Sequence, residues 1–343
     1  MKGIILCAGK ATRMQPYSFT QPKTLLPVAG RPVLDHCLDN MRQAGIEEIA
    51  IVINPRQKQI IDHVSRSQPN LQVRYIHQRK QRGILHAVKM AEDFIDDDPF
   101  VLMLGDNLIS EPLTTLLDSF DGHHGAILLS EVENPSDYGI ATIEDDRIIR
   151  IQEKPKKPPS NLAVIGAYVF DGDMLDAFDH IKPSARGEYE ITDAIQWLID
   201  SGRSVSFSLT TKPYSDVGTA ERWLEANRWM LRQRAGDGVI VGDNTVLDNC
   251  KLIPPVVIGR DCELTNATIG PYVSLQDDCE LEDCRIEHSI CLENTVIQHV
   301  KQPITHSIFG RDTELQGDDG DPGKLQCLLG DKSKLWVMEK KRK

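Results

Sequence analysis

The sequence predicts an α/β protein with two successive architectures, a Rossmann-like, mainly parallel sheet and then a left-handed parallel β-helix of hexapeptide repeats. Short β-branched runs alternate with amphipathic helical segments up to about residue 106, and after Gly236 aliphatic residues recur every six positions. The 343 residues suit about two domains, since one domain typically holds ~100–200. We expect the first over residues 1–235, the β-helix over 236–315, and a tail over 316–343 that caps the β-helix or frays.

Four apolar runs near the N-terminus are expected to be strands that alternate with helices. The runs are Lys2–Cys7, Ile49–Ile53, Val73–His77 and Phe100–Leu104. Apolar residues fall at helical spacing over 33–41 and again over 84–91. This alternation favours a parallel sheet covered on both faces, in which ligands bind beyond the carboxyl ends of the strands. Residues just after Leu6 and Leu104 are therefore the first candidates for a ligand site.

The stretch from about residue 130 to 234 continues the same domain, because no long linker separates it from the first part. Strands are expected near Ile140–Ile143, Ile148–Gln152 and Val164–Phe170, and helices near Ile191–Ile199 and Ala220–Leu231.

The β-helix prediction rests on a period of six. Aliphatic residues at 240, 246, 252, 258 and 264 are six apart, and after one five-residue step the series continues at 269, 275 and 281. The tetrapeptide Asp-Cys-Glu-Leu recurs 17 residues apart, at 261–264 and 278–281, close to the ~18 residues of a three-hexapeptide coil. Cys262 and Cys279 are thus expected to stack in the core. The alternative is a sandwich with strands of similar length.

The net charge and the length of the apolar stretches argue against two classes of partner, nucleic acids and membranes. With 39 Lys+Arg against 51 Asp+Glu, the net charge of −12 disfavours nucleic acid, which requires a basic face. No apolar stretch approaches the ~20 residues that span a bilayer, and Lys10 interrupts the N-terminal run before a signal-peptide core forms. The eight cysteines include no CxxC pair. We therefore expect a cytoplasmic protein with free thiols and no membrane partner.

Two motifs near the N-terminus carry the strongest chemical signal. The run Leu6–Arg13 (LCAGKATR) is followed by Gln21–Pro27 (QPKTLLP), so that Arg13 and Lys23 are ten residues apart. A strand that ends in small residues lets backbone N–H groups approach a phosphate chain, and Arg13 and Lys23 would supply positive charge. Either half alone would be interpreted as an ordinary strand-to-helix turn with a solvated cation; together they form a specific pattern.

With the later motifs LGDN (104–107), DYG (137–139), QEKP (152–155), GEYEITD (187–193) and SDVGT (215–219), the sequence resembles the sugar-phosphate nucleotidyltransferases. Within that family it most resembles the long-form glucose-1-phosphate thymidylyltransferases. The resemblance covers residue 1 to about 231, and long members also carry hexapeptide repeats. One departure is Ala11, which stands where the family usually has glycine, so phosphate binding is in question if a glycine conformation is needed there.

The resemblance implies a reaction in which a sugar 1-phosphate attacks the α-phosphate of a nucleoside triphosphate and pyrophosphate leaves, with Mg²⁺ as cofactor. The substrates it most directly implies are glucose 1-phosphate and dTTP, giving dTDP-glucose. The alternatives are transfer from UTP or GTP, forming UDP-glucose or GDP-mannose, and a non-catalytic regulatory subunit that binds nucleotide sugars.

Site residues carried over from the family's motifs fall into four groups. The catalytic residues implied are Arg13, Lys23 and Lys154. The nucleotide-binding residues implied are Leu6, Ala8, Gly9, Thr12, Gln78, Gly83 and Asp106. The sugar-binding residues implied are Asn107, Gly139, Glu153, Lys154 and Val164. Asp106 and Asp216 match the magnesium ligands. Residues 79–82 depart from the commoner apolar residue before the glycine, which leaves the base open.

The histidines form no metal-binding spacing. His36, His63, His77 and His86 are expected to be structural or surface residues. His288, His299 and His306 lie in the predicted β-helix, a fold that also supports acyltransferases with a histidine base, so a second activity stays open. We expect the β-helix to serve instead in homo-oligomer contact or effector binding.

Overall fold

The computed structural model describes residues 1–317 and 326–337. Its contacts divide the chain into two compact units. The sheet unit combines Met1–Lys10 with Leu34–Tyr214, and the β-helix unit combines Ala11–Val33 with Ser215–Lys343. The first motif is therefore divided between the units after Lys10. Within the described residues no helix has the length and apolar character needed to cross a membrane.

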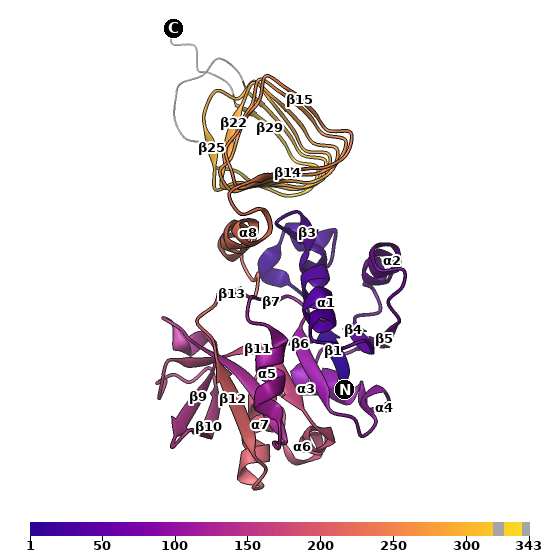
Figure 1. Cartoon of the computed structure of the whole chain (residues 1–343), viewed down its shortest axis with the longest axis vertical. Coiled ribbons are helices and arrows are strands. Elements are labelled where there is room, and N and C mark those ends of the chain that lie inside the picture. Colours follow the sequence, from indigo (N-terminus) through magenta and orange to yellow (C-terminus); the bar gives the residue numbers. More distant parts are fainter. Residues whose placement is uncertain (318–325, 338–343) are drawn as a thin grey trace. The chain divides into compact units, whose positions relative to one another are not determined.

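A nine-stranded, mainly parallel sheet forms the sheet unit (Figure 1). Its main order is β12 (Val205–Leu209), β8 (Gly125–Glu131), β11 (Leu162–Phe170), β6 (Phe100–Leu104), β1 (Lys2–Leu6), β4 (Ile49–Ile53) and β5 (Val73–His77). Only β11 runs antiparallel to its neighbours β6 and β8 in this order. The hairpin of β9 (Gly139–Glu144) and β10 (Arg147–Glu153) joins the sheet where Ile140 pairs with Ala163 at the start of β11. The predicted Rossmann-like sheet is confirmed.

Helices and short elements connect these strands. They are α1 (Val33–Gln43), α2 (Lys58–Ser67), α3 (Ile84–Lys89), α4 (Glu92–Ile95), β7 (Leu108–Ile109), α5 (Leu113–Phe120), η4 (Pro135–Asp137), η5 (Gly172–Leu175), α6 (Ala177–His180), α7 (Ile191–Asp200) and β13 (Tyr214–Ser215). The strands β4 and β6 are apolar along their whole length because both faces of the sheet are covered; Ile4, Ala50 and Leu102, for example, are fully buried.

The hexapeptide segment forms three parallel sheets stacked coil on coil, as Figure 1 shows in orange and yellow. One sheet contains β14 (Val239–Val241), β17 (Val256–Ile258), β20 (Val273–Leu275), β23 (Ile290–Cys291), β26 (Ile308–Phe309) and β28 (Leu328–Leu329). The second contains β15 (Val246–Asp248), β18 (Glu263–Thr265), β21 (Glu280–Glu282), β24 (Val296–Gln298), β27 (Glu314–Gly317) and β29 (Lys334–Val337). The third contains β16 (Lys251–Leu252), β19 (Thr268–Ile269), β22 (Arg285–Glu287) and β25 (Ile304–Thr305). This arrangement confirms the predicted parallel β-helix.

The stacked core agrees with the sequence except in the first coil. Leu264 pairs with Leu281, 17 residues on, and Cys262 and Cys279 are buried free thiols as expected. The placement of Ile240 and Val246 in the inward series was wrong. Val241 pairs with the buried Ile258, and Leu247 pairs with Leu264. Each of these early coils has one side of five residues, which in the first coil runs from Leu247 to Leu252. Counting back from Leu252 in steps of six therefore misses the inward residues by one position. Val246 faces outward in the structure.

The β-helix continues past residue 315. Strands β28 and β29 add a coil in which Leu328 pairs with Ile308, 20 residues earlier, whereas the pair Val256 and Val273 is 17 apart. The longer spacing hides this coil from a search for hexapeptide periods. Most of the acidic break and the basic end Lys340–Lys343 lie outside the described residues.

Helix α8 (Ala220–Ala235) links the β-helix to the loop of residues 11–33 within the same unit. That loop contains η1 (Thr12–Met14), η2 (Tyr17–Phe19), η3 (Lys23–Leu25) and the two-residue strands β2 (Pro27–Val28) and β3 (Arg31–Pro32). The fully buried Trp223 of α8 donates from Nε1 to the carbonyl oxygen of Pro27 at 2.7 Å and packs edge-on against Tyr17.

A buried amide joins all three parts of this unit. Asn227 of α8 is 1% exposed, and its Oδ1 accepts hydrogen bonds from the Ala29 backbone N–H at 2.8 Å and from the Ser274 hydroxyl of β20 at 2.7 Å. The loop that carries Lys23 is thus fixed both to α8 and to the β-helix.

Candidate active site

The end of β1 lies beside the end of β6 at the carboxyl edge of the sheet. The Gly105 N–H donates to the carbonyl oxygen of Leu6 at 2.9 Å, which continues the pairing beyond the strands. Gly105 permits this approach, because a Cβ there would lie 2.5 Å from the Cys7 sulfur. Asp106 and Asn107 follow directly. The residues predicted after Leu6 and after Leu104 are therefore neighbours.

After β1 the chain is buried at Cys7 and Ala8 and becomes accessible at Gly9. Ala8 accepts a hydrogen bond at its carbonyl oxygen from the side-chain amide of Gln81. Gly9 is exposed, and a Cβ built on it would meet nothing within 4 Å. Such open backbone is what a phosphate chain needs for close approach to N–H groups.

Gln78 and Gly83 come together at the end of β5. Gly83 lies just before α3 with φ of 98°, and a Cβ there would be 2.4 Å from the carbonyl oxygen of Tyr189, so this position requires glycine. The side chain of Gln78 is buried, and its Nε2 lies 3.3 Å from the Gly83 carbonyl oxygen and 2.9 Å from Nδ1 of His86. His86 was predicted as a structural or surface residue; it contacts Gln78, one of the two predicted base-binding residues.

The predicted sugar-binding residues gather around the start of β11. Glu153, the last residue of β10, pairs with Gly139 of β9, and β9 joins β11 beside Val164. Asn107 donates from Nδ2 to the carbonyl oxygen of Ile165 at 3.0 Å, while its buried Oδ1 has no hydrogen-bond partner among the described residues. The topology of the sheet thus brings together residues that are up to 57 positions apart in the sequence.

Glu153 is held by Thr192 and Arg186, which were not predicted as site residues. It accepts a hydrogen bond from the Thr192 hydroxyl at 3.1 Å and from the Arg186 guanidinium at 3.1 Å, and Nζ of Lys154 lies 3.9 Å away. Lys154 itself has φ of 42° and a half-exposed side chain. Thr192 and Arg186 lie within or beside the GEYEITD motif, so membership of that motif was the available signal.

In the β-helix unit, Asp216 pairs with Arg222, and the charges of Lys23 and Arg13 act on it. Arg222 donates from one nitrogen to both carboxylate oxygens of Asp216, at 2.8 and 2.9 Å. Burial raises the pKa of this carboxyl, but the hydrogen bond from Arg222 and the charges of Lys23 and Arg13 hold the pKa below its ordinary value. Asp216 is therefore ionised at neutral pH.

Arg222 was not predicted from the sequence. It is fixed by the start of α8, where the Thr219 hydroxyl accepts a hydrogen bond from the Arg222 backbone N–H at 3.3 Å. A capping threonine followed three residues later by arginine was the only signal, and that pattern alone does not point to a carboxylate.

Ala11 adopts the left-handed conformation that glycine favours, with φ of 51° and ψ of 36°. Its carbonyl oxygen accepts hydrogen bonds from the Ser18 hydroxyl at 2.8 Å and the Met14 N–H at 3.0 Å, and Thr12 begins η1 immediately after it. A left-handed conformation costs a non-glycine residue ~1–2 kcal/mol. The loop therefore keeps a glycine-type backbone despite the methyl group.

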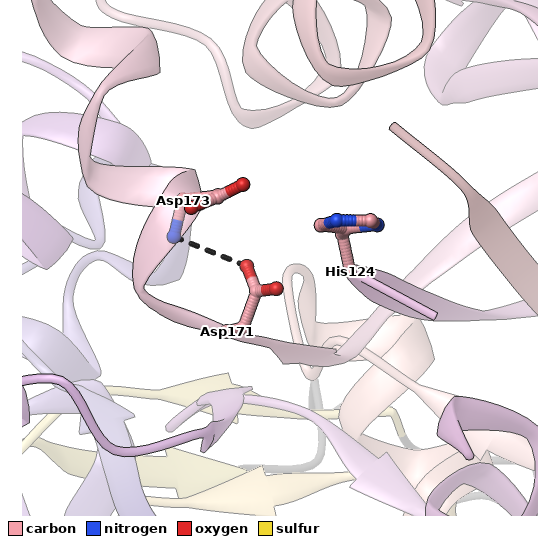
Figure 2. Close-up of side chains that lie close together, drawn as sticks. All are labelled: His124, Asp171 and Asp173. Atoms are coloured by element: carbon pink, nitrogen blue, oxygen red, sulfur yellow. Dashed lines mark hydrogen bonds between the residues drawn. The ribbon is translucent and has the colours of Figure 1, made fainter. Parts of the chain in front are cut away.

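Another cluster of metal-ligating groups lies at the opposite edge of the sheet. Figure 2 shows Asp171 and Asp173 on one turn with His124 facing them, and the Asp173 N–H donates to Asp171 at 3.1 Å. His124 precedes β8 and Asp171 follows β11, where Phe170 pairs with the first residue of β6. Arg203 also pairs with Asp173 at 2.6 Å.

The histidines of the β-helix make contacts with one another or with acids. His288 and His306 stack with ring centroids 5.0 Å apart, and His288 also lies against Tyr272. His299 contacts Asp283 at 2.9 Å on the exposed surface.

Comparison with known proteins identifies the family. Residues 2–233 match the model of the Nucleotidyl transferase family. The chain belongs to the nucleotidyl transferase family. It is 35% identical over 357 aligned positions to a glucose-1-phosphate thymidylyltransferase of Streptomyces griseus, with 98% of this chain and 99% of the relative covered. It is 39% identical to a UTP–glucose-1-phosphate uridylyltransferase of Haloferax volcanii, with 66% of this chain and 96% of the relative covered.

A solved structure agrees with these relatives. It is a provisionally assigned glucose-1-phosphate thymidylyltransferase from Bacillus anthracis in complex with sucrose, 33% identical, with a TM-score of 0.62. The match covers 66% of this chain and 94% of that chain. The predicted family and enzyme class are thus confirmed, and the Streptomyces relative aligns with nearly the whole chain, including the β-helix of this nucleotidyltransferase.

Proposed function

We propose that this nucleotidyltransferase makes dTDP-glucose and pyrophosphate from dTTP and glucose 1-phosphate. The observation that carries the proposal is the cluster of Arg13, Lys23 and Arg222 around an ionised Asp216, in a chain that aligns almost fully with a thymidylyltransferase. Both substrates are anions, so such a protein must supply concentrated positive charge despite a net charge of −12.

In the reaction, an oxygen of the sugar phosphate forms a bond to the α-phosphorus of the triphosphate while the bond to the β-phosphate oxygen breaks. The electron pair of the broken bond leaves on pyrophosphate, and catalysis depends mainly on positioning and on charge stabilisation. Arg13 and Lys23 would bind the triphosphate and stabilise the leaving pyrophosphate. Lys154 would hold the sugar phosphate.

Glu153 suits a role in sugar binding. Thr192 and Arg186 fix its carboxylate, and a fixed carboxylate is a strong acceptor for sugar hydroxyl groups. Asn107, Gly139 and Val164 lie around the same strand start and would complete this side of the site. The backbone of Leu6, Ala8, Gly9 and Thr12 would face the phosphates of the nucleoside triphosphate.

Asp106 and Asp216 are the residues that would hold Mg²⁺. The donor set fits, because carboxylate oxygens are the ligands that Mg²⁺ prefers and Asp216 is ionised. When bound, the cation would neutralise phosphate charge and polarise the phosphorus–oxygen bond.

The nucleotide and the sugar are tested by a substrate panel. The full chain is incubated with Mg²⁺ and each pair drawn from dTTP, UTP, GTP and CTP with glucose 1-phosphate or mannose 1-phosphate, and pyrophosphate release is followed. The highest kcat/KM should come from dTTP with glucose 1-phosphate. A preference for UTP would favour the activity of the Haloferax relative, and a preference for GTP with mannose 1-phosphate would overturn the thymidylyl assignment.

A non-catalytic regulatory role would give no turnover in any arm of that panel. The presence of all five charged residues, Arg13, Lys23, Asp106, Lys154 and Asp216, favours the enzyme.

We also propose that the protein is cytoplasmic and a homo-oligomer, with residues 1–235 as the catalytic domain. Light scattering after size-exclusion chromatography would give the mass of the assembly.

A further inference from the structure

The side-chain amide of Gln78 has only one chemically consistent orientation. The carbonyl oxygen of Gly83 can only accept, so the amide atom 3.3 Å from it must be the NH₂ group, Nε2. The same Nε2 lies 2.9 Å from Nδ1 of His86. Nδ1 must therefore be unprotonated and accept, which places the imidazole proton on Nε2. The remaining amide atom, Oε1, can only accept a hydrogen bond.

Gly83, whose carbonyl oxygen the Gln78 amide contacts, also supplies a backbone donor. It is the residue before α3, and the N–H of such a residue lies outside the helix's own hydrogen bonds. A base that binds here meets one donor, the Gly83 N–H, beside one acceptor, Oε1 of Gln78. Thymine, uracil and guanine carry a carbonyl oxygen next to a ring N–H and match this pair. Cytosine and adenine carry an amino group next to a bare ring nitrogen and oppose it.

We propose that His86 is a positioning residue for base selection: it fixes the Gln78 amide so that the site takes nucleotides with a carbonyl beside a ring N–H and rejects cytosine and adenine nucleotides. This inference rests on the proposed function, because Gln78 and Gly83 must be the groups that face the base. The contact with His86 fixes which amide atom of Gln78 would meet the base, which Gln78 and Gly83 do not determine by themselves.

The surroundings of His86 keep it neutral. It is the third residue of α3, its ring centroid lies 6.2 Å from that of Phe178, and Arg82 is the charged group that acts on it. Burial and the positive charge of Arg82 lower the pKa of His86 from its ordinary value near 6.5. At neutral pH Nδ1 therefore accepts from Gln78. As the pH falls through the lowered pKa, Nδ1 gains a proton, two donors oppose each other, and the orientation of the amide is lost.

The test compares kcat/KM for dTTP with kcat/KM for CTP, using glucose 1-phosphate, between about pH 5.5 and pH 8. The wild-type ratio should be constant near neutral pH and fall at the acid end. His86→Leu removes the acceptor, so the ratio at neutral pH should drop about tenfold, the effect of losing one orienting hydrogen bond. His86→Gln can accept through its own oxygen and does not titrate, so it should keep the neutral-pH ratio and abolish the acid fall.

The His86→Gln profile also corrects for protonation of the triphosphate, which affects both proteins equally. An unchanged ratio in His86→Leu, or the same acid fall in His86→Gln as in the wild type, would overturn the role of His86. Calorimetric Kd values for dTTP and CTP with Mg²⁺ give the same comparison without turnover. A wild-type protein that binds dTTP over CTP but releases no pyrophosphate would refute the proposed reaction and leave base selection measurable.

Discussion

Replacing Asn227 by leucine should destabilise the β-helix unit strongly. The change removes one oxygen that accepts from two buried donors, the Ala29 N–H and the Ser274 hydroxyl. A buried donor left without an acceptor costs about 1–3 kcal/mol, so the two together should cost about 2–6 kcal/mol, toward the lower end where the serine hydroxyl can rotate to another acceptor. That is a large fraction of the about 5–15 kcal/mol that stabilises a typical protein.

The assay is urea unfolding of the full chain, with the free energy of unfolding taken from the midpoint and slope. Ser274→Ala is the matched control, because it removes one donor and leaves the bond between Asn227 and Ala29 intact; it should cost about 0.5–1.5 kcal/mol. A loss below about 1 kcal/mol in Asn227→Leu would refute the reasoning. So would equal losses in the two variants, since the bond to the loop would then contribute nothing.

Further predictions concern the loop and the charged cluster. Ala11→Gly should leave stability unchanged or raise it by up to about 1.5 kcal/mol, because relief of the left-handed backbone outweighs the entropy of glycine; a loss above about 1 kcal/mol in thermal unfolding would contradict this. Arg222→Met should raise the pKa of Asp216, so the acid limb of the pH profile of kcat/KM should move to higher pH, and an unmoved limb would contradict it. Asp216→Asn should abolish pyrophosphate release if the carboxylate holds the metal, whereas turnover at the wild-type rate would exclude that role. Lys23→Ala should lower kcat/KM for dTTP by about 10² or more, measured at saturating glucose 1-phosphate; a change below threefold would exclude a role in binding the triphosphate.

The strands that the sequence predicted were those with a clear boundary at each end. Ile49–Ile53, Val73–His77 and Phe100–Leu104 have the bounds that the structure gives. Strand β8 was missed. Six of its seven residues are buried, so it shows no alternation of apolar and polar residues, and a short apolar run of that kind cannot be distinguished from a buried helix by its period.

The motifs predicted residues that would face the proposed ligands, but not the residues that hold those side chains in place. Asn227 contacts a backbone N–H 198 positions earlier, and Thr192 contacts Glu153 from 39 positions away. Contacts of this kind follow from the pairing of distant segments, which periodicity and local motifs do not encode. His86 is the exception, since it lies eight positions from Gln78, yet the orientation of an amide needs the three-dimensional contact as well.

Arg222 and a metal ion would not compete for Asp216. A carboxylate offers about four lone-pair sites, and Arg222 takes one on each oxygen through a single nitrogen. One further site on each oxygen remains for a cation. The arginine helps to keep the carboxylate ionised and fixes its plane, and the charges of Lys23 and Arg13 also act on it. Under the proposed function, Arg13 and Lys23 near this acid and Lys154 on the sugar side would supply the positive charge that two anionic substrates require from a chain with a net charge of −12.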